Sequence, residues 1–355
     1  MPPRRRKRLD PATFQLPIER MREGAYTALQ HRATRELLHA AETPTRVVLQ
    51  VTATSPGWLA GIDEAVAILK LGAEDWSALA VQALYEGDRL DGWDTVLTID
   101  GAYDAFVHLE PLLLGVLERR TRVHTNVRRL VEAARPKTIL VAPAAHDHWF
   151  LQPGDGWAVR LAGADAVLSE AAASWTTGAP RVAVVTHSLV AVHGGDVAAA
   201  TRALAGRLGD DVRLLAPAAH RNDCVAASLA LARALPDRLW GVVLDTPSFL
   251  VDQSILPQMG AFDPTGVNPP LVWAVRNALD AEGFGDVKLV VAGGFDVGRI
   301  RRFEEEGVPV DCYAVGGAVF DGRVPFVADI VEVNGAAAER VGRARRANPK
   351  LEKVK

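Results

Sequence analysis

The sequence is poor in cysteine and in long apolar runs. Two cysteines, Cys224 and Cys312, occur among 355 residues. This excludes a disulfide framework and a cysteine-based zinc site, so we expect a reducing compartment, the cytoplasm. No run approaches the about 20 apolar residues of a membrane-spanning helix, and no secretory signal peptide is recognisable. We therefore expect a soluble protein with no membrane partner.

Neither sign of charge dominates. The formal net charge is -3 and 23% of the residues are charged, which gives no support to a nucleic-acid partner. Lysine and arginine gather at the two ends, in residues 1–8 and 346–355. Because runs of like charge usually stay solvated, we expect basic tails there.

Seven short apolar runs alternate with helical patterns in the second part of the chain. The runs cover 138–142, 166–170, 181–187, 212–218, 239–246, 287–293 and 310–316. The helical patterns between the later runs cover 196–208, 223–235, 267–284 and 296–307. The runs are continuously apolar, as in parallel strands that are buried on both faces. This α/β pattern predicts a (β/α) barrel more than an open sheet.

The first third and the C-terminal end follow another pattern. Residues 46–54 and 95–101 are expected strands, 62–72 an expected helix, and 105–134 a long helical stretch. Residues 328–342 resemble a hairpin with its turn at Asn334-Gly335, a turn dipeptide that favours positive φ angles. We expect this hairpin to return to the N-terminal sheet.

Polar residues and glycine pairs stand where the apolar runs end. His187 and Asp245 each close a run, and the pairs Gly293–Gly294 and Gly316–Gly317 end two successive runs. Ligands of barrels gather at the carboxyl ends of the strands, and glycine lets backbone N–H groups approach a phosphate. We therefore expect a phosphate site at the glycines, with His187 and Asp245 facing a ligand. Glycines required only by tight turns, and a hydrogen-bonded histidine at a barrel rim, are the alternatives.

A metal site has weaker support. His146 and His148 flank Asp147, a spacing that can ligate a metal, but nothing fixes a third ligand. His220 and Cys224 are the other candidates. We predict no protein-bound metal.

Several stretches together resemble the nicotinate phosphoribosyltransferase family, a type II phosphoribosyltransferase family. They are "MREGAYTALQHRATRELL", "QPGDGWAVRLAGADAVLS", "THSLVAVHGGDVAAATRA", "LDTPS", "KLVVAGGFDVGRI" and "AVGGAV". The resemblance implies an irregular (β/α) barrel over 121–324. It also implies an α/β sandwich domain that is built from both chain ends, 9–120 with 325–345. Family members form dimers or higher oligomers whose active site lies between subunits.

The resemblance also implies an activity and a set of site residues. The family joins nicotinate to phosphoribosyl pyrophosphate, which binds with Mg²⁺, and some members couple ATP hydrolysis. The product is a pyridine mononucleotide for NAD biosynthesis. By this resemblance His187 and Asp245 are catalytic residues. Those assigned to the 5-phosphate are Gly293, Gly294, Gly316 and Gly317, and those assigned to substrate are Tyr26, Thr27 and Thr246.

The chain departs from the family at ligand-facing positions. Where the family has Asp-Xaa-Tyr-Phe-Xaa-Arg after the Tyr-Thr pair, this sequence has Ala28, Gln30, His31 and Ala33. Family arginines are replaced at Ala144 or Ala145 and at Val243. A hydrogen bond to a charged group typically contributes about 1.5–3 kcal/mol, so these losses weaken phosphate binding.

Three hypotheses follow. The first is a working transferase that acts on phosphoribosyl pyrophosphate and nicotinate or a related pyridine carboxylate, with cations such as Arg221 replacing those lost. The second is a catalytically inactive paralogue that keeps the fold as a binding or regulatory subunit. The third is a divergent enzyme on a less anionic substrate, for which His31, His146 and His148 supply the polar groups. The first is our prediction.

Overall fold

The chain folds into two compact units. The computed structural model describes residues 7–142, 147–176, 178, 180–260, 262–338 and 340–355. One unit combines Met1–Thr125 with Asp321–Lys355, and the other is Asn126–Phe320. The boundaries expected from sequence, after residues 120 and 324, differ from these by a few residues.

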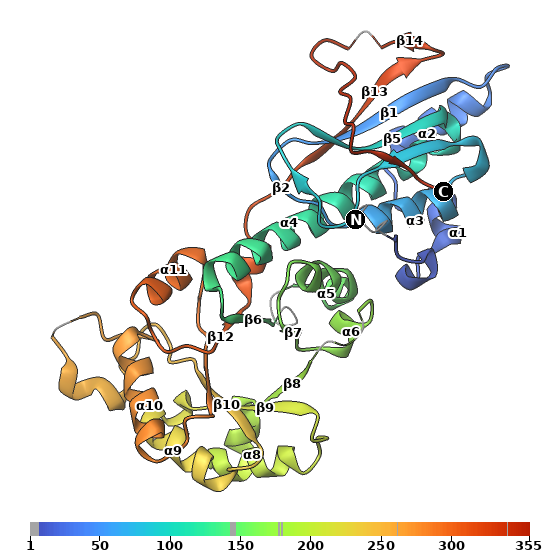
Figure 1. Ribbon diagram of the computed structural model, residues 1–355. Coiled ribbons are helices and arrows are strands. Elements are labelled where there is room, and N and C mark those ends of the chain that lie inside the picture. Colours follow the sequence, from blue (N-terminus) through green and yellow to red (C-terminus); the bar gives the residue numbers. More distant parts are fainter. Residues whose placement is uncertain (1–6, 143–146, 177, 179, 261, 339) are drawn as a thin grey trace, which may run out of the picture. The chain divides into compact units, whose positions relative to one another are not determined.

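The first unit is built on an antiparallel sheet to which both chain ends contribute (Figure 1). In spatial order its strands are β14 (Ala336–Ala337), β13 (Phe326–Val333), β1 (Arg46–Ala53), β5 (Asp94–Ala102), β3 (Ala80–Ala83) and β15 (Glu352–Lys353). Its helices are α1 (Ile18–Arg22), α2 (Leu29–His39), α3 (Ile62–Gly72) and the part of α4 (Glu110–Ala134) up to Thr125. A separate pair joins β2 (Gly57–Trp58) to β4 (Arg89–Leu90).

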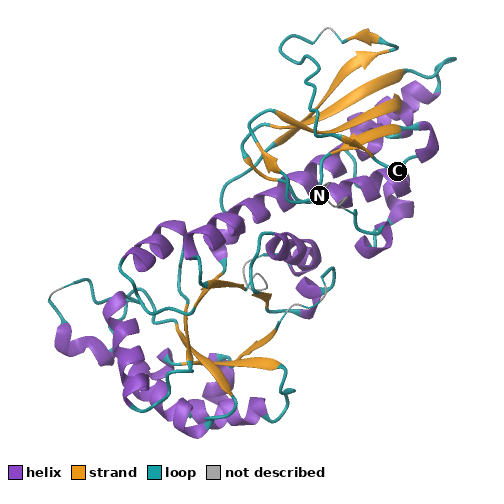
Figure 2. Cartoon of the chain, viewed as in Figure 1, coloured by secondary structure: helices purple, strands orange, loops and turns teal. Residues whose placement is uncertain are grey.

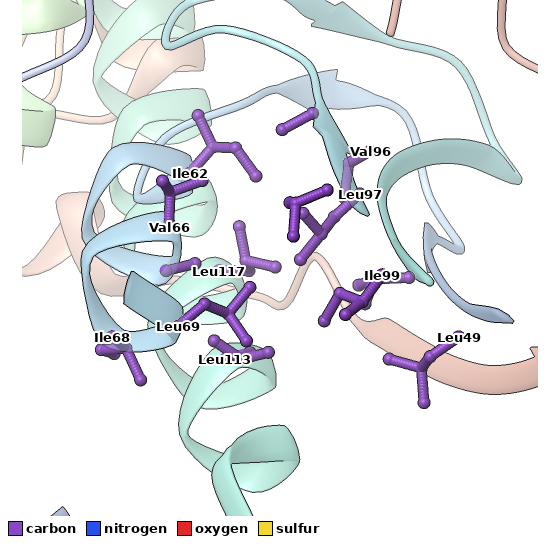
Figure 3. Close-up of a cluster of buried hydrophobic side chains, with 14 of the residues drawn as sticks. Leu49, Ile62, Val66, Ile68, Leu69, Val96, Leu97, Ile99, Leu113 and Leu117 are labelled. Carbon is purple, nitrogen blue, oxygen red and sulfur yellow. The ribbon is translucent and has the colours of Figure 1, made fainter. Parts of the chain in front are cut away.

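Helices α3 and α4 bury their apolar faces against this sheet. Figure 3 shows Val66 and Leu69 of α3 with Leu113 and Leu117 of α4 facing Leu97 of β5. Leu69, Leu97, Leu113 and Leu117 have no solvent exposure. Because such burial stabilises by about 25 cal/mol per Å² of apolar surface, this layer holds both chain ends in one unit.

The predicted hairpin near the C-terminal end is confirmed. β13 pairs antiparallel with β14 and, on its other side, with β1 of the N-terminal segment. Asn334 and Gly335 form its turn with φ angles of 49° and 84°, the left-handed conformations that a two-residue turn of this type requires.

The prediction of solvated basic tails is wrong for the described parts of both ends. β15 pairs with β3, and the neighbouring Val354 is buried in the core of the first unit. At the other end the Arg8 guanidinium donates a 2.8 Å hydrogen bond to the Asp63 carboxylate. A run of like charge usually indicates a solvated segment. Here one run contains the apolar Val354, and the other pairs with the buried Asp63, 55 residues away in the sequence, which a local pattern does not reveal.

The second unit is the predicted barrel. Seven parallel strands surround an apolar interior, with helices outside them (Figure 2). In chain order they are β6 (Thr138–Val141), β7 (Ala166–Val167), β8 (Arg181–Val184), β9 (Val212–Pro217), β10 (Leu239–Leu244), β11 (Lys288–Val291) and β12 (Cys312–Val315). The ladder runs from β8 through β12 to β6 and β7. The ring is therefore nearly closed, with its opening between β7 and β8.

Helices follow the strands, and the four predicted from sequence correspond to the last four of these helices. The helices are α5 (Gln152–Leu161), α6 (Glu170–Ala173), α7 (His187–Val192), α8 (Val197–Ala205), α9 (Cys224–Ala234), α10 (Pro269–Ala281) and α11 (Val297–Glu305). The side chains of Asp196, Asp223 and Asn268 accept N-cap hydrogen bonds at α8, α9 and α10. Among the described residues, no helix combines the length and apolar character needed to cross a membrane.

The core of the first unit gives a direct stability test. We expect Leu97→Ala to lower the free energy of unfolding by about 2–5 kcal/mol, because it leaves a cavity at a fully buried position. Leu37→Ala changes the same side chain at a position that is 71% exposed, and should stay within about 0.5 kcal/mol of the wild type. Urea unfolding followed by far-ultraviolet circular dichroism measures both. Equal losses in the two variants would contradict this assignment of the core.

Candidate active site

His187 and Asp245 meet where strands β8 and β10 end. His187 is the first residue of α7, whose N-cap is Thr186, and Asp245 directly follows β10. The Nε2 atom of His187 lies 3.0 Å from Oδ2 of Asp245. A carboxylate only accepts hydrogen bonds, so His187 donates from Nε2. The structure thus brings the two predicted catalytic residues together.

A second histidine, which the sequence analysis considered only as a metal ligand, completes this group. His220 belongs to the short helix η7 (Ala219–Arg221) after β9. Its Nδ1 atom lies 3.1 Å from Nδ1 of His187, and the two rings stack with centroids 5.3 Å apart. One Nδ1 must carry a proton and the other must accept it, so the pair shares a single proton at this contact.

The electrostatic environment disfavours a charge on the His220 ring. Burial disfavours the charged form of His220, and His187 and Arg221 repel its positive charge, so its pKa is lowered from the usual value near 6.5. A neutral His220 can accept a hydrogen bond at Nδ1 from His187, whose Nε2 atom lies against the Asp245 carboxylate.

Asp245 keeps one oxygen available to a ligand. Its Oδ2 receives the bond from His187, whereas Oδ1 is buried and has no hydrogen-bond partner among the described residues. A buried carboxylate oxygen without a donor is costly unless a ligand or water satisfies it. This oxygen can accept from a hydroxyl group or bind a divalent cation.

The two glycine pairs differ in geometry. Gly293 and Gly294 follow β11 with φ angles of 88° and 78°, a conformation that side chains rarely adopt. Gly316 and Gly317 follow β12 without positive φ, and a Cβ added at Gly317 would meet nothing within 4 Å. Only Gly293 and Gly294 therefore have backbone angles that require glycine. At Gly317 the space that a side chain would occupy is open.

A cation that sequence reasoning missed lies beside the first glycine pair. The guanidinium of Arg299, on α11, donates 2.5 Å hydrogen bonds to the carbonyls of Gly293 and Val267. It also stacks 4.1 Å from the centre of the Phe295 ring. Burial and the charge of Arg302 lower the pKa of Arg299. The sequence shows an arginine in the helix that follows the glycines. It does not show that the Arg299 side chain reaches back to the Gly293 carbonyl.

Of the other predicted substrate residues, Thr246 lies next to Asp245, whereas Tyr26 and Thr27 lie in the first unit. Thr246 is buried, with its hydroxyl 3.7 Å from the Cys224 sulfur, and burial raises the pKa of that thiol. Tyr26 and Thr27 belong to the first unit, just before α2. The Thr27 hydroxyl is buried and has no hydrogen-bond partner among the described residues. Within the chain, the structure does not assign these two residues to the unit that contains His187.

The metal candidates named from sequence are not brought together. His148 caps a short helix by accepting from the Phe150 N–H at 3.3 Å, and His146 lies outside the described residues. In the described chain, one group has metal-ligand geometry, namely His39, Glu74 and Asp104 of the first unit. Arg35 already pairs with Glu74, which opposes a cation. No sequence spacing could have indicated this group, since its members are about 30 residues apart.

The histidine pair makes a testable prediction about protonation. In NMR titration we expect the His220 ring to titrate below about 6.5, the usual histidine value. Folding then disfavours protonation of His220, so its protonation destabilises the fold as pH falls below about 6.5. His187→Ala should raise the pKa only part of the way, because burial remains.

His193→Ala serves as the control, because His193 is not among the groups that shift the pKa of His220. It should leave the titration unchanged. A wild-type His220 that titrates at or above about 6.5 would contradict this arrangement.

Comparisons with known proteins identify relatives of this chain. Residues 32–121 match the model of the quinolinate phosphoribosyl transferase N-terminal domain. A nicotinate phosphoribosyltransferase of Mycobacterium tuberculosis is 26% identical over 266 residues, which cover 72% of this chain and 54% of the relative. The chain thus spans about half the length of the curated relatives it matches.

Solved structures have the same architecture. A nicotinate-nucleotide pyrophosphorylase from Pyrococcus furiosus superposes with a TM-score of 0.78 and 27% identity, covering 93% of this chain and 80% of that one. Human nicotinic acid phosphoribosyltransferase superposes with a TM-score of 0.63 over 95% of this chain and 77% of its own, and its 17% identity shows the fold alone.

Proposed function

The chain belongs to the nicotinate, or type II, phosphoribosyltransferase family, and from this premise we propose that it transfers a phosphoribosyl group to a pyridine carboxylate. The acceptor that we favour is nicotinate, and the donor is phosphoribosyl pyrophosphate. The observation that carries the proposal is the His187–Asp245 pair, which lies 3.0 Å apart at the carboxyl ends of barrel strands.

Transfer at the anomeric carbon places three requirements on the protein. A cation-like sugar must be shielded, the departing pyrophosphate must be neutralised, and the pyridine nitrogen must be aimed at the sugar. Asp245 suits the first role, because its unpartnered Oδ1 can accept from a ribose hydroxyl or stabilise positive charge. Mg²⁺ enters with the pyrophosphate of the substrate, and the same carboxylate oxygen is the ligand type that it prefers.

His187 and Arg221 suit the second role. His187 is held at the strand ends by Asp245 and His220. Arg221 lies beside His220 on η7 and supplies a guanidinium for phosphate oxygens. His187 and Arg221 would take the place of the arginines that the family has where this chain has Val243 and Ala144 or Ala145.

A second candidate function is that of an inactive paralogue that binds ligand or a partner subunit. The observation that favours it is the environment of Val243. Its side chain is 7% exposed and packs with Leu140, Leu215 and Val290 inside the barrel. An arginine that reaches a phosphate is here replaced by apolar filling of the interior, which stabilises the barrel and offers the ligand nothing.

Steady-state kinetics and calorimetry separate the two candidates. We expect pyridine mononucleotide to form from nicotinate, phosphoribosyl pyrophosphate and Mg²⁺, and Asp245→Asn to lower kcat/KM by ~10²–10⁴-fold. Asp237→Asn makes the same change on an exposed loop before β10, at the opposite end of the same strand, and should leave kcat/KM unchanged. Phosphoribosyl pyrophosphate binding without turnover would favour the inactive paralogue. No heat of binding at millimolar ligand would overturn the transferase and the ligand-binding paralogue, and would leave only a paralogue that binds a partner subunit.

A further inference from the structure

The second unit contains a cavity of about 800 Å³ beside the candidate active site. It is lined by Thr246, which follows β10, by Gly293, which follows β11, and by residues of helices α10 and α11. The segment between β10 and α10 contributes Ser248, Asp263 and Thr265. This volume lies within the about 300–1,000 Å³ of small-molecule sites, and it is several times larger than one substituted pyridine ring needs.

One wall of the cavity offers an aromatic surface. Trp273 of α10 lines the cavity and is 43% exposed. Asn277, one helical turn further on, lines it as well. An indole that remains exposed in a concave site is a stacking surface for a planar ring, and the amide can pair with polar ring atoms.

The opposite wall offers two guanidiniums. Arg299 and Arg302 of α11 both line the cavity. Neither forms an ion pair with any residue that the structure describes. They are close enough that the charge of Arg302 lowers the pKa of Arg299, which is also half-buried. Adjacent guanidiniums without a carboxylate partner attract an anion, for which phosphate is a suitable shape.

The cavity lining also contains two carboxylates. Asp263 and Glu306 also line the cavity. Asp263 accepts hydrogen bonds from the N–H and the hydroxyl of Thr265, at 3.0 and 2.8 Å. Ionised carboxylates accept hydrogen bonds from sugar hydroxyls, as in nucleotide-binding folds. An aromatic face, hydroxyl acceptors and guanidiniums are the three features that recognise a base, a ribose and a phosphate.

We propose that the cavity between α10 and α11 is a second ligand site that adjoins the transfer site and binds a nucleoside monophosphate. Trp273 stacks on the base, Asp263 or Glu306 accepts from the ribose, and Arg299 and Arg302 hold the phosphate. Because the cavity shares Thr246 and Gly293 with the strand ends, its occupancy reaches the transfer site through those residues. The proposal rests on the cavity and does not require transferase activity.

Calorimetry with two probes tests the site. Adenosine monophosphate and nicotinate mononucleotide carry the same sugar phosphate and differ in the base, so their relative affinities separate a purine regulator from a pyridine nucleotide product. Arg302→Glu and Trp273→Ala should each weaken binding of the tighter probe by at least ~10-fold. Arg301→Glu is the matched control, because it makes the same charge change on the next residue, which does not line the cavity. It should change affinity by less than ~2-fold.

Two further measurements separate the cavity from the transfer site. Binding of adenosine monophosphate should persist in His187→Ala and in the presence of saturating phosphoribosyl pyrophosphate. Adenosine without phosphate, and inorganic phosphate without a base, should each bind at least ~10-fold more weakly than the nucleotide. Equal effects of Arg302→Glu and Arg301→Glu, competition by phosphoribosyl pyrophosphate, or no binding of either nucleotide at millimolar concentration would overturn the proposal. Turnover is assayed separately, so a failure of the transferase proposal and a failure of the nucleotide-site proposal can be told apart.

Discussion

The apolar interior of the barrel is the constraint on which the candidate site depends. Leu140, Leu215, Val243 and Val290 pack together inside the ring and hold four parallel strands at fixed spacing. Parallel strands direct all their carboxyl ends to one rim. His187, His220 and Asp245, which follow three of the strands within three positions, therefore meet although up to 58 residues separate them. The positions of the polar atoms at the rim are set by hydrophobic packing beneath them.

Much of the fold could be predicted because its signals are local. Continuous apolar runs gave the seven barrel strands, and Asn334-Gly335 gave the hairpin turn. Local chemistry also misled. The helical pattern that starts at residue 223 would make Asn222 the N-cap of α9, but Asn222 adopts the left-handed conformation with φ 57°, and its neighbour Asp223 is the cap. Both residue types cap helices well, so the sequence could not decide between adjacent positions.

The candidate site was predictable only in part. His187 and Asp245 stood out because a polar residue that ends a buried strand is unusual. The contact of His187 with His220 depends on how η7 leaves β9, and no spacing encodes that path. Arg299 likewise gains its role from a turn that brings α11 back to Gly293. The charged and polar side chains at this rim come from residues whose proximity only the three-dimensional structure shows.

The opening of the barrel between β7 and β8 has a consequence for His187. Strand β8 is hydrogen-bonded to β9 alone within the described part of the chain, and its side chains are partly exposed. An edge strand with a single ladder separates from its neighbour at a lower free-energy cost than one that is paired on both sides. His187, which follows this strand, is therefore positioned by one of the two edge strands of the barrel. The contacts of His187 with Asp245 and His220 link the end of this edge strand to the residues that follow β10 and β9.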